Sequence, residues 1–357
     1  MNIITATKNF EAWLACQTTL VPEDLRLKHR QMREDLFMFL RATHYRWAQI
    51  FPAACRMANK APEVLAVGDL HVENFGTWRD AEGRLVWGVN DFDECHPLPC
   101  AHDLVRLTVS AFLAIEAGEL SLPAERATAA ILQGYKACLK AGGRPLVLDD
   151  MSTPLRAMAR HRLNTPEKFW NKIQAHPALR GPVPKKILRA IEELLPDRKI
   201  ELRFIHRVAG LGSLGKQRFT ALGQWRGALV AREAKALTAS ACRFAGGRPP
   251  GGKIHYDKIL RRAVRCLDPL VTVKGDWLVR RLSQDCFRIP LSHLPEKRNE
   301  PDLLHFMGWE TANIHLGSAD AARLEKWLRR QPADWLHKAA TTMRGETARD
   351  WRRWIRG

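Results

Sequence analysis

Two short acidic segments hold the side chains best suited to chemistry. The first reads GDLHVENFG over residues 68–76 and contains Asp69 and Asn74; the second reads VNDFDE over residues 89–94 and contains Asp91 and Asp93. Transfer of a phosphoryl group needs a carboxylate that orients or deprotonates an acceptor hydroxyl, and oxygen ligands that hold Mg2+ against the phosphates. The five-residue separation of Asp69 and Asn74 is typical of a catalytic base and a metal-binding amide in a tight loop. Asp91 or Asp93 would supply the carboxylate ligand, and the choice between them stays open.

A structural role is the alternative for each of these residues. Acidic and amide side chains at strand ends often cap turns or helices. However, the two strand-end loops together carry four acidic or amide residues and one histidine: Asp69, Asn74, Asp91, Asp93 and His71. Neighbouring carboxylates repel one another unless a cation lies between them. The combination therefore favours a site over a set of unrelated caps.

A glycine-rich segment, GLGSLG, occupies residues 210–215. This pattern is weak evidence by itself, because it also occurs in hairpin turns. A dinucleotide-binding fold would need a helix directly after the glycines, whereas the following KQRFTALG alternates like a strand. Glycines between two strands let backbone N–H groups approach phosphates. The nucleotide-binding residues predicted here are Gly210, Gly212, Ser213 and Gly215.

Lys235 follows the glycine segment by twenty residues, near the end of another predicted strand. This position suits a lysine that holds the phosphates of a nucleotide. The alternatives are an exposed strand-end lysine and a competing cation at Arg232. No glutamate partner for Lys235 is identified, and Glu233 is expected to point to the opposite face of the strand.

Several motifs resemble a known enzyme group. GDLHVEN resembles the catalytic loop of the aminoglycoside phosphotransferase and choline kinase branch of the kinase-like fold, where the run is typically GDxHxxN; VNDFDE resembles the metal-binding segment that follows there, and CAHDLVRL resembles the start of a later helix. More closely, FMFLRATHYRW, GDLHVENFG, NDFDE and GLGSLGKQRF resemble a bacterial family of unknown function, domain 2252. This resemblance extends from about residue 30 to about residue 320. The resemblance to the kinase-like enzymes implies ATP and Mg2+ as cofactors.

The resemblance also implies a role for each residue of the site. Asp69 would be the catalytic base, Asn74 a metal ligand and Asp91 the main metal ligand. Asp93 would be a second ligand or a supporting carboxylate.

Two further residues would support the catalytic loop. The resemblance implies that Asp103 and His71 brace it, the former through backbone hydrogen bonds. One departure concerns the residue before the loop glycine, which is often His in such loops and is Val67 here.

The hydrophobic patterns predict where the elements that carry these residues begin and end. Helices are expected over 8–60, 101–141, 166–176, 183–195 and 301–357, with a shorter one over 255–267. Strands are expected at VLAV, at RLVWGV, in three successive runs between 200 and 236, and at 276–283.

The predicted fold class is α+β, helix-rich, with the two lobes of a protein-kinase-like fold in permuted order. Four regions are expected: an N-terminal helical segment over 1–60, a catalytic-loop and metal-binding lobe over 61–200, a β lobe with the glycine-rich loop over 201–290, and a C-terminal helical segment over 291–357. The order is permuted because the glycine loop and Lys235 follow the catalytic loop by about 140 residues, whereas in protein kinases they precede it. Permutation is feasible where chain junctions lie at the surface.

Composition sets further limits. The 357 residues carry a formal net charge of +19, which favours anionic partners. The N-terminus lacks the features of a signal peptide. No apolar run approaches the roughly 20 residues of a membrane span. The eight cysteines form no CxxC pair. We therefore expect a reduced cytoplasmic protein without a membrane span. A zinc site at Cys95, His96, Cys100 and His102 is a minor alternative, since the spacing fits no common zinc pattern.

Three functions stay open. The first is an ATP- and Mg2+-dependent phosphotransferase that acts on a small hydroxyl-bearing, preferably anionic acceptor. The second is a non-catalytic, pseudokinase-like nucleotide-binding module. The third is a basic nucleic-acid-binding protein, although no nucleic-acid-binding motif is present. Trp351 and Trp354, three residues apart among arginines, favour a docked terminal helix over a nucleic-acid or membrane contact.

Overall fold

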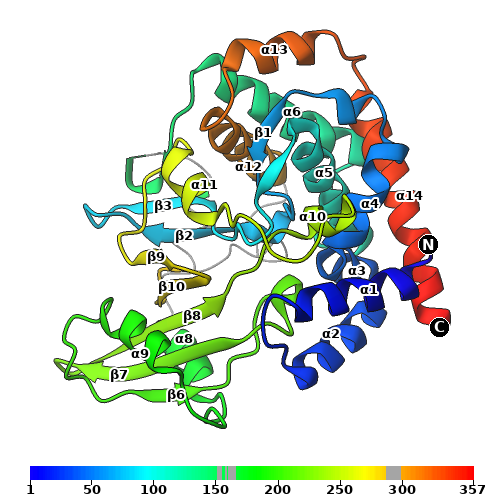
Figure 1. Cartoon of the computed structure of the whole chain (residues 1–357). Coiled ribbons are helices and arrows are strands. Elements are labelled where there is room, and N and C mark those ends of the chain that lie inside the picture. Colours follow the sequence, from blue (N-terminus) through cyan, green and yellow to red (C-terminus); the bar gives the residue numbers. More distant parts are fainter. Residues whose placement is uncertain (151–154, 157–158, 160–165, 287–298) are drawn as a thin grey trace.

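The computed structural model describes residues 1–150, 155–156, 159, 166–286 and 299–357 of the chain. Helices make up most of it, and the strands form three separate antiparallel sheets (Figure 1). The helix-rich α+β prediction is therefore confirmed. None of the helices in the described residues combines the length and hydropathy that a bilayer crossing requires.

The main core lies among long helices of the larger, helical part. The central helix is α5 (Cys100–Glu116), almost all of whose residues are buried. It packs against α6 (Ala124–Lys140) and α14 (Trp335–Arg356), while α12 (Glu300–Leu316) lies along α6 and α13 (Ala321–Arg329) lies at one edge of this group. These helices fall within the segments for which the apolar spacing predicts helices.

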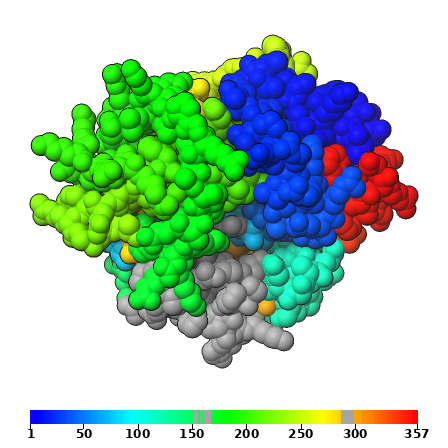
Figure 2. All heavy atoms as spheres, turned by 90° about the horizontal axis from the view of Figure 1, so that it is seen from below, coloured from blue at the N-terminus to red at the C-terminus, as the bar shows by residue number. Residues whose placement is uncertain are grey.

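The N-terminal helices form a second cluster beside α14 (Figures 1 and 2). They are α1 (Ile3–Ala15), α2 (Pro22–Glu34), α3 (Leu36–Ala42) and α4 (His44–Ala54), followed by the short helix η1 (Ala58–Lys60). The Trp351 indole N–H donates to the carbonyl oxygen of Met32 (3.1 Å), and Trp354 is buried in this cluster. The terminal helix is therefore docked through its tryptophans, while Arg352 and Arg353 are exposed.

Two small sheets carry the acidic segments. Strand β1 (Glu63–Ala66) pairs with β4 (His96–Pro99), and the second sheet has the order β2 (Phe75–Arg79), β3 (Leu85–Val89), β5 (Leu146–Val147). The short helices η2 (Val72–Asn74) and η3 (Leu148–Asp150) adjoin them. The strands β1 and β3 match the predicted strands, whereas β2, β4 and β5 were not predicted. Asp69 therefore follows β1, and Asp91 follows β3.

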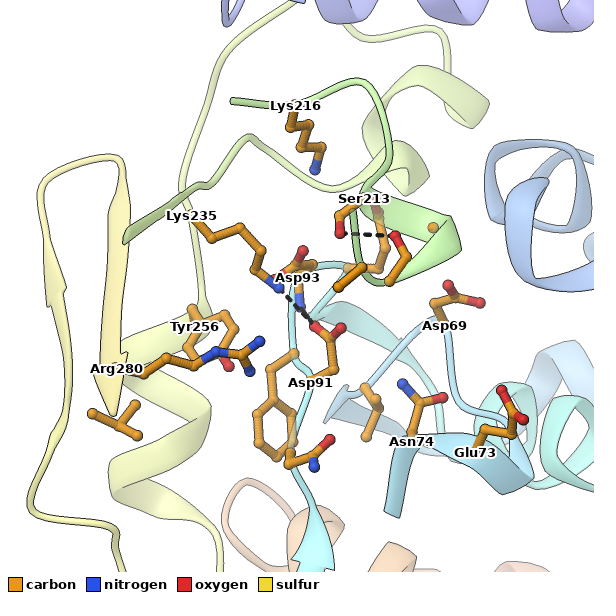
Figure 3. A pocket seen from close by; sticks show the side chains of 18 of the residues that line it. Asp69, Glu73, Asn74, Asp91, Asp93, Ser213, Lys216, Lys235, Tyr256 and Arg280 are labelled. Atoms are coloured by element: carbon orange, nitrogen blue, oxygen red, sulfur yellow. Dashed lines mark hydrogen bonds and ion pairs between the residues drawn. The ribbon is translucent and has the colours of Figure 1, made fainter. Parts of the chain in front are cut away.

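The largest sheet has five strands in the order β6 (Arg203–Ile205), β7 (Arg218–Trp225), β8 (Ala228–Ala236), β10 (Trp277–Leu282), β9 (Val271–Lys274). Helix α9 (Lys185–Glu192) packs on one face through Ile187 and Ile191. Helix α8 (Pro166–Gln174) packs on the outer end of the opposite face through Ile173. The rest of that opposite face is turned toward the acidic segments (Figures 1 and 3).

The predicted strands of this region are confirmed, with two adjustments. The turn between β7 and β8 has only two residues, Arg226 and Gly227, so the strand extends further into the GQWRG segment than expected. After the sheet strand β8 come α10 (Ala241–Ala245) and α11 (Tyr256–Arg262), the second of which is shorter than the predicted helix over 255–267.

Candidate functional site

A cavity of about 470 Å3 lies between the acidic segments and the largest sheet. Nine of the predicted site residues line it: Asp69, His71, Asn74, Asp91, Asp93, Gly210, Gly212, Ser213 and Lys235. Gly215 and Asp103 do not line it and lie behind the segments that do. The fold therefore brings the acidic loops and the glycine-rich loop to one site, although about 140 residues separate them in the sequence.

Asp103 holds the start of the loop that carries Asp69. Its carboxylate accepts hydrogen bonds from the backbone N–H groups of Val67 (2.7 Å) and Gly68 (2.9 Å), and His315 Nε2 lies 3.1 Å from it. Burial alone would raise the pKa of Asp103, but the neighbouring imidazoles of His102 and His315 bring it below its usual range. The carboxylate therefore stays ionised and fixes the backbone where β1 ends.

His71 and Asn74 shape the next turn of the loop. The Asn74 side-chain oxygen accepts a hydrogen bond from the His71 backbone N–H (2.9 Å), and His71 Nδ1 accepts one from the Glu73 backbone N–H (3.2 Å). Reciprocal bonds of this kind fix the first turn of a helix, here η2. An amide oxygen has two lone pairs, so Asn74 keeps one for a further ligand.

Asp69 is oriented by a buried arginine. Arg106 on α5 is fully buried and bonds the Asp69 Oδ1 atom through both Nε (3.0 Å) and Nη2. The other oxygen, Oδ2, faces the glycine-rich loop, since a Cβ atom on Gly212 would lie 3.1 Å from it. Burial raises the pKa of Asp69, and Arg106 opposes this effect. One oxygen is therefore held in place, and the other is directed into the cavity.

Asp91, Asp93 and Lys235 meet at the centre of the cavity (Figure 3). The Lys235 ammonium lies 2.7 Å from Asp93 Oδ1 and 3.4 Å from Asp91 Oδ1. Lys235 is only 2% exposed, which excludes an exposed strand-end lysine. Arg232, the competing cation, instead donates to the Leu194 carbonyl oxygen and does not line the cavity.

The two carboxylates differ in their affinity for protons. Burial and the neighbouring Asp91 charge raise the pKa of Asp93 to about 6. Burial also acts on Asp91, but the charges of Lys235 and Arg280 bring its pKa below the usual range. The buried Asp93 Oδ2 has no hydrogen-bond partner among the described residues. An unpartnered carboxylate oxygen in a closed site is suited to a cation.

The donor set fits Mg2+ better than zinc. In the described part of the chain, no group of three or more His, Cys, Asp or Glu side chains is placed to hold a metal ion. The zinc alternative at Cys95, His96, Cys100 and His102 is therefore not supported. Mg2+ commonly takes only one or two carboxylates and completes its shell with waters and phosphate oxygens. Asp91 and Asp93, with the Asn74 amide oxygen nearby, match that pattern.

The glycine-rich loop joins β6 to β7, which confirms the expected strand–loop–strand arrangement. Its short helix η4 (Leu211–Ser213) rests against α3, and α2 holds the loop from outside. Lys28 Nζ donates to the Gly212 carbonyl oxygen (3.0 Å), and the Val21 N–H donates to that of Gly215 (2.8 Å). The loop is thus fixed between the N-terminal helices and Asp69.

Glu233 lies on the same face of β8 as Lys235, so the expectation that it points to the opposite face is wrong. Residues two apart in a strand share a face, because successive side chains alternate. Glu233 is fully buried and forms no ion pair with Lys235. It instead pairs with Arg207, Arg218 and Arg280.

The sequence interpretation missed most of the cations that line the cavity. Five of them come from α2, the residue after the third loop glycine, the β6–β7 connection, β7 and β10: Lys28, Lys216, Arg207, Arg218 and Arg280. Four more arginines also line the cavity: Arg41, Arg261, Arg265 and Arg281. Two of them, Arg218 and Arg280, could have been found from the pairing of the strands. Arg218 lies opposite Lys235, and Arg280 lies opposite Glu233, so all four side chains share one face.

Comparison with known proteins connects part of this site to a family. Residues 20–179 match the sequence model of a family described as an uncharacterized protein conserved in bacteria (DUF2252). Neither the comparison with curated proteins nor that with solved structures found a match. The matched segment contains both acidic loops and ends before the glycine-rich loop. It supports the resemblance to this bacterial family that the sequence motifs indicate.

Proposed function

We propose that this chain is an ATP- and Mg2+-dependent phosphotransferase that acts on a small hydroxyl-bearing acceptor. The observation that carries the proposal is the meeting of three groups in one cavity. Gly212 of the glycine-rich loop lies against Asp69 Oδ2, and the Lys235 ammonium contacts the carboxylates of Asp91 and Asp93 in the same cavity (Figure 3). These are the parts that phosphoryl transfer requires: a base, metal ligands and phosphate-binding groups.

The order of elements in the largest sheet supports a kinase-like arrangement. In protein kinases a glycine-rich loop covers the phosphates, and the phosphate-binding lysine stands on the third strand. Here the glycine-rich loop connects β6 and β7, and Lys235 stands on β8, the next strand of the sheet. The lobe with the acidic loops comes first in the sequence, so a kinase-like relationship would require the permuted order.

Each part of the site would have its own role in phosphoryl transfer. Arg106 holds Asp69 Oδ1, which leaves Oδ2 to accept the proton of an acceptor hydroxyl. Asp91, Asp93 and Asn74 would hold Mg2+, which when bound neutralises charge on the phosphate oxygens. Lys235 and the glycine-rich loop would position the phosphates. Positioning and charge stabilisation supply most of the catalysis in this reaction class.

The electrostatic character of the cavity supports an anionic ligand. Lysines and arginines outnumber aspartates and glutamates among the residues that line it. Several of these cations are largely buried, which is costly without an anion close by. A nucleoside triphosphate supplies such charge, and so does a phosphorylated acceptor.

A radiolabel transfer assay tests the proposal. Purified protein with γ-labelled ATP and Mg2+ is incubated with pools of sugars, amino alcohols, nucleosides and their phosphates, and labelled products are separated. We expect transfer to a member of one pool, and its loss in Asp69→Asn. Mg2+-dependent ATP binding without transfer to any pool or to water would favour the non-catalytic nucleotide-binding alternative.

A further inference from the structure

Three arginines surround a single buried glutamate on the cavity wall. Arg207 Nη1 and Arg218 Nη1 each lie 2.6 Å from a Glu233 carboxylate oxygen. Arg280 donates to the same carboxylate through Nε (3.1 Å) and Nη2 (2.9 Å). The Thr220 hydroxyl adds a weaker bond (3.3 Å). All three guanidinium groups therefore lie around one anion.

This cluster has more positive charge than the glutamate can neutralise. One arginine suffices to balance a buried carboxylate, so the cluster has two positive charges more than Glu233 neutralises. Asp91 offsets part of this excess at Arg280. The Glu233 side chain is fully buried, and that of Arg218 is 9% exposed. Burying a cation without an anion close by is unfavourable, because the ion loses its hydration. A purely structural pairing does not explain why three arginines share this position.

The cluster also has unused hydrogen-bond donors that reach the cavity. Arg207 and Arg280 line the cavity, and their side chains are 22% and 23% exposed. Among the described residues, Arg207 Nε and Nη2 and Arg280 Nη1 have no acceptor within hydrogen-bond distance. A planar guanidinium with free N–H groups matches the oxygens of a phosphate or carboxylate. Glu233 would then hold the guanidinium groups in place.

The position of the cluster connects it to the rest of the site. Arg280 extends from β10 toward Asp91, on the side of Lys235 that is remote from Asp69 (Figure 3). Lys216 enters the same cavity beside the glycine-rich loop, is 6% exposed, and forms no ion pair with any residue that the structure describes. Cationic side chains thus continue from the glycine-rich loop past Lys235 to the arginine cluster.

We propose that Arg207 and Arg280 form an anion subsite that binds a phosphate group of a ligand beside the metal-binding carboxylates. Arg218, whose Nη2 donates to the Ala209 carbonyl oxygen (2.9 Å) and to Ser213 Oγ (3.1 Å), would hold Glu233 in place between them. The subsite itself follows from the arginine geometry. Only its place in a reaction depends on the proposed phosphotransferase function. The phosphate could belong to the chain of the phosphoryl donor or to a phosphorylated acceptor, because both present the same oxygens to the guanidinium groups.

Calorimetric titration with inorganic pyrophosphate in EDTA tests the subsite without the metal. We expect Arg207→Gln and Arg280→Gln each to weaken binding at least tenfold. Arg198→Gln is the matched control, since it removes the same charge from an exposed position of the same region and should change affinity less than twofold. Equal affinities for all four proteins would overturn the proposal.

A second variant distinguishes a direct loss of pyrophosphate binding from a loss of folding. Arg207→Lys keeps the charge next to Glu233 but removes the planar fork. We expect it to keep the melting temperature of the wild type within a few degrees and still to bind pyrophosphate several-fold more weakly. If this variant folds normally and binds pyrophosphate with wild-type affinity, the planar guanidinium of Arg207 does not contribute to binding.

Crystals soaked in tungstate locate the anion directly. The proposal expects an anomalous peak within hydrogen-bond distance of the Arg207 and Arg280 guanidinium groups. A peak only beside Lys216 or Lys235, or no ordered peak in the cavity, would contradict it.

Competition then separates the two sources of the phosphate. If pyrophosphate still binds when Mg2+ and a non-hydrolysable ATP analogue saturate the protein, the subsite serves an acceptor; if the analogue displaces it, the subsite serves the donor. Either result requires the arginine-dependent binding that supports the proposal. If the arginine variants bind pyrophosphate as tightly as the wild type while Mg2+-dependent ATP binding is intact, the subsite proposal is wrong. The proposed phosphotransferase function is not affected by that result.

Discussion

The two walls of the cavity are built in opposite ways. The acidic wall comes from a single stretch, from Asp69 to Glu94, and is fixed by backbone hydrogen bonds to Asp103 and within η2. The basic wall comes from α2, the glycine-rich loop and three strands, and is fixed by strand register and by Glu233. Chemistry concentrated in one loop can be recognised from sequence spacing. Chemistry assembled across strands requires the pairing of those strands to be known.

The walls are also complementary in charge. On the acidic wall, burial raises the pKa values of Asp69 and Asp93, and Asp93 Oδ2 has no hydrogen-bond partner in the described residues. On the basic wall, burial would raise the pKa of Glu233, but Arg218, Arg207 and Arg280 hold it well below its usual range. One wall therefore favours a cation and the other an anion. A magnesium–phosphate ligand would satisfy both.

The largest expected effect concerns the acidic wall. Asp69→Asn should lower turnover by about 10²–10⁴-fold, the usual contribution of a general base, while nucleotide affinity changes little. The amide retains a hydrogen bond to Arg106. Steady-state rates and nucleotide titrations on the variant measure both quantities.

Asp350→Asn is the control for that variant. Asp350 is a second buried carboxylate that pairs with an arginine, at 2.6 Å from Arg46 Nε and away from the cavity. Its loss should reduce the free energy of unfolding but not turnover. Full activity in Asp69→Asn would remove Asp69 from the role of base.

The next effect concerns the contact between the walls. Lys235→Met leaves Asp91 and Asp93 without their ammonium partner, and breaking a buried ion pair on one side typically costs about 3–5 kcal/mol. Chemical denaturation at pH 7 should show this loss together with weaker nucleotide binding. Lys274→Met removes an exposed pair between β9 of the same sheet and Glu193 (2.9 Å), and should leave the free energy of unfolding almost unchanged. Similar losses for the two variants would contradict a special role for Lys235.

A smaller effect is expected in the glycine-rich loop. Gly215 has a φ of +97°, and a Cβ atom there would overlap Leu25 of α2. Gly215→Ala should therefore cost about 1–3 kcal/mol and weaken ATP binding by displacing the loop. Gly227→Ala is the matched control, because Gly227 also has a positive φ (+84°) but a Cβ atom added to it would have no neighbour within 4 Å. Unchanged ATP affinity in Gly215→Ala would indicate that the loop does not contact the nucleotide.

The smallest effect is a pH dependence of the acidic wall. Mg2+ binding needs an ionised Asp93, whose pKa of about 6 means that the metal must displace a proton at lower pH. Mg2+-dependent ATP affinity should therefore fall up to tenfold per pH unit below 6. Calorimetry between pH 5 and 8 tests this, and a flat profile in that range would be inconsistent with a metal on Asp93.

The same group has the opposite effect on the ligand-free protein. Because the folded-state pKa of Asp93 lies above its ordinary value of 3.8, the folded state binds this proton more tightly than the unfolded chain. The stabilisation is fully present below about pH 4 and is lost as the pH rises to 6. The contribution of Asp93 to stability should thus decrease where metal affinity increases.

The acidic wall could be predicted from sequence because its signals are local. The strand endings at β1 and β3, the spacing of Asp69 and Asn74, and the polar pair Asp91 and Asp93 all lie within a short segment. The helices were also predictable, since their apolar faces repeat every three to four residues. Strands β2 and β4 were missed although they are as long as β3 and β1. The first two residues of β2 belong to the GDLHVENFG segment, which was assigned to a loop, and β4 contains two prolines, which count against a strand. The short strands β5 and β9 were missed as well.

The basic wall was only partly predictable. Lys235 was found through its distance from the glycine-rich loop, but the face of Glu233 was assigned incorrectly. Lys28 could not be found, because it precedes Gly212 by 184 residues and the contact between the two exists only in the folded chain. Arg106 was missed because an arginine inside an apolar helix gives no indication that it is fully buried against Asp69.

The most direct test of the account is the melting temperature of the protein with and without Mg2+ and ATP, beside Asp91→Asn. A ligand at about 100 times its Kd stabilises the folded state by roughly 2.7 kcal/mol, which shifts the melting temperature by several degrees. We expect a shift with wild type that requires both Mg2+ and ATP and that is lost in Asp91→Asn. An equal shift in the variant, or no shift with wild type at millimolar Mg2+ and ATP, would contradict a magnesium–nucleotide site at Asp91, Asp93 and Lys235.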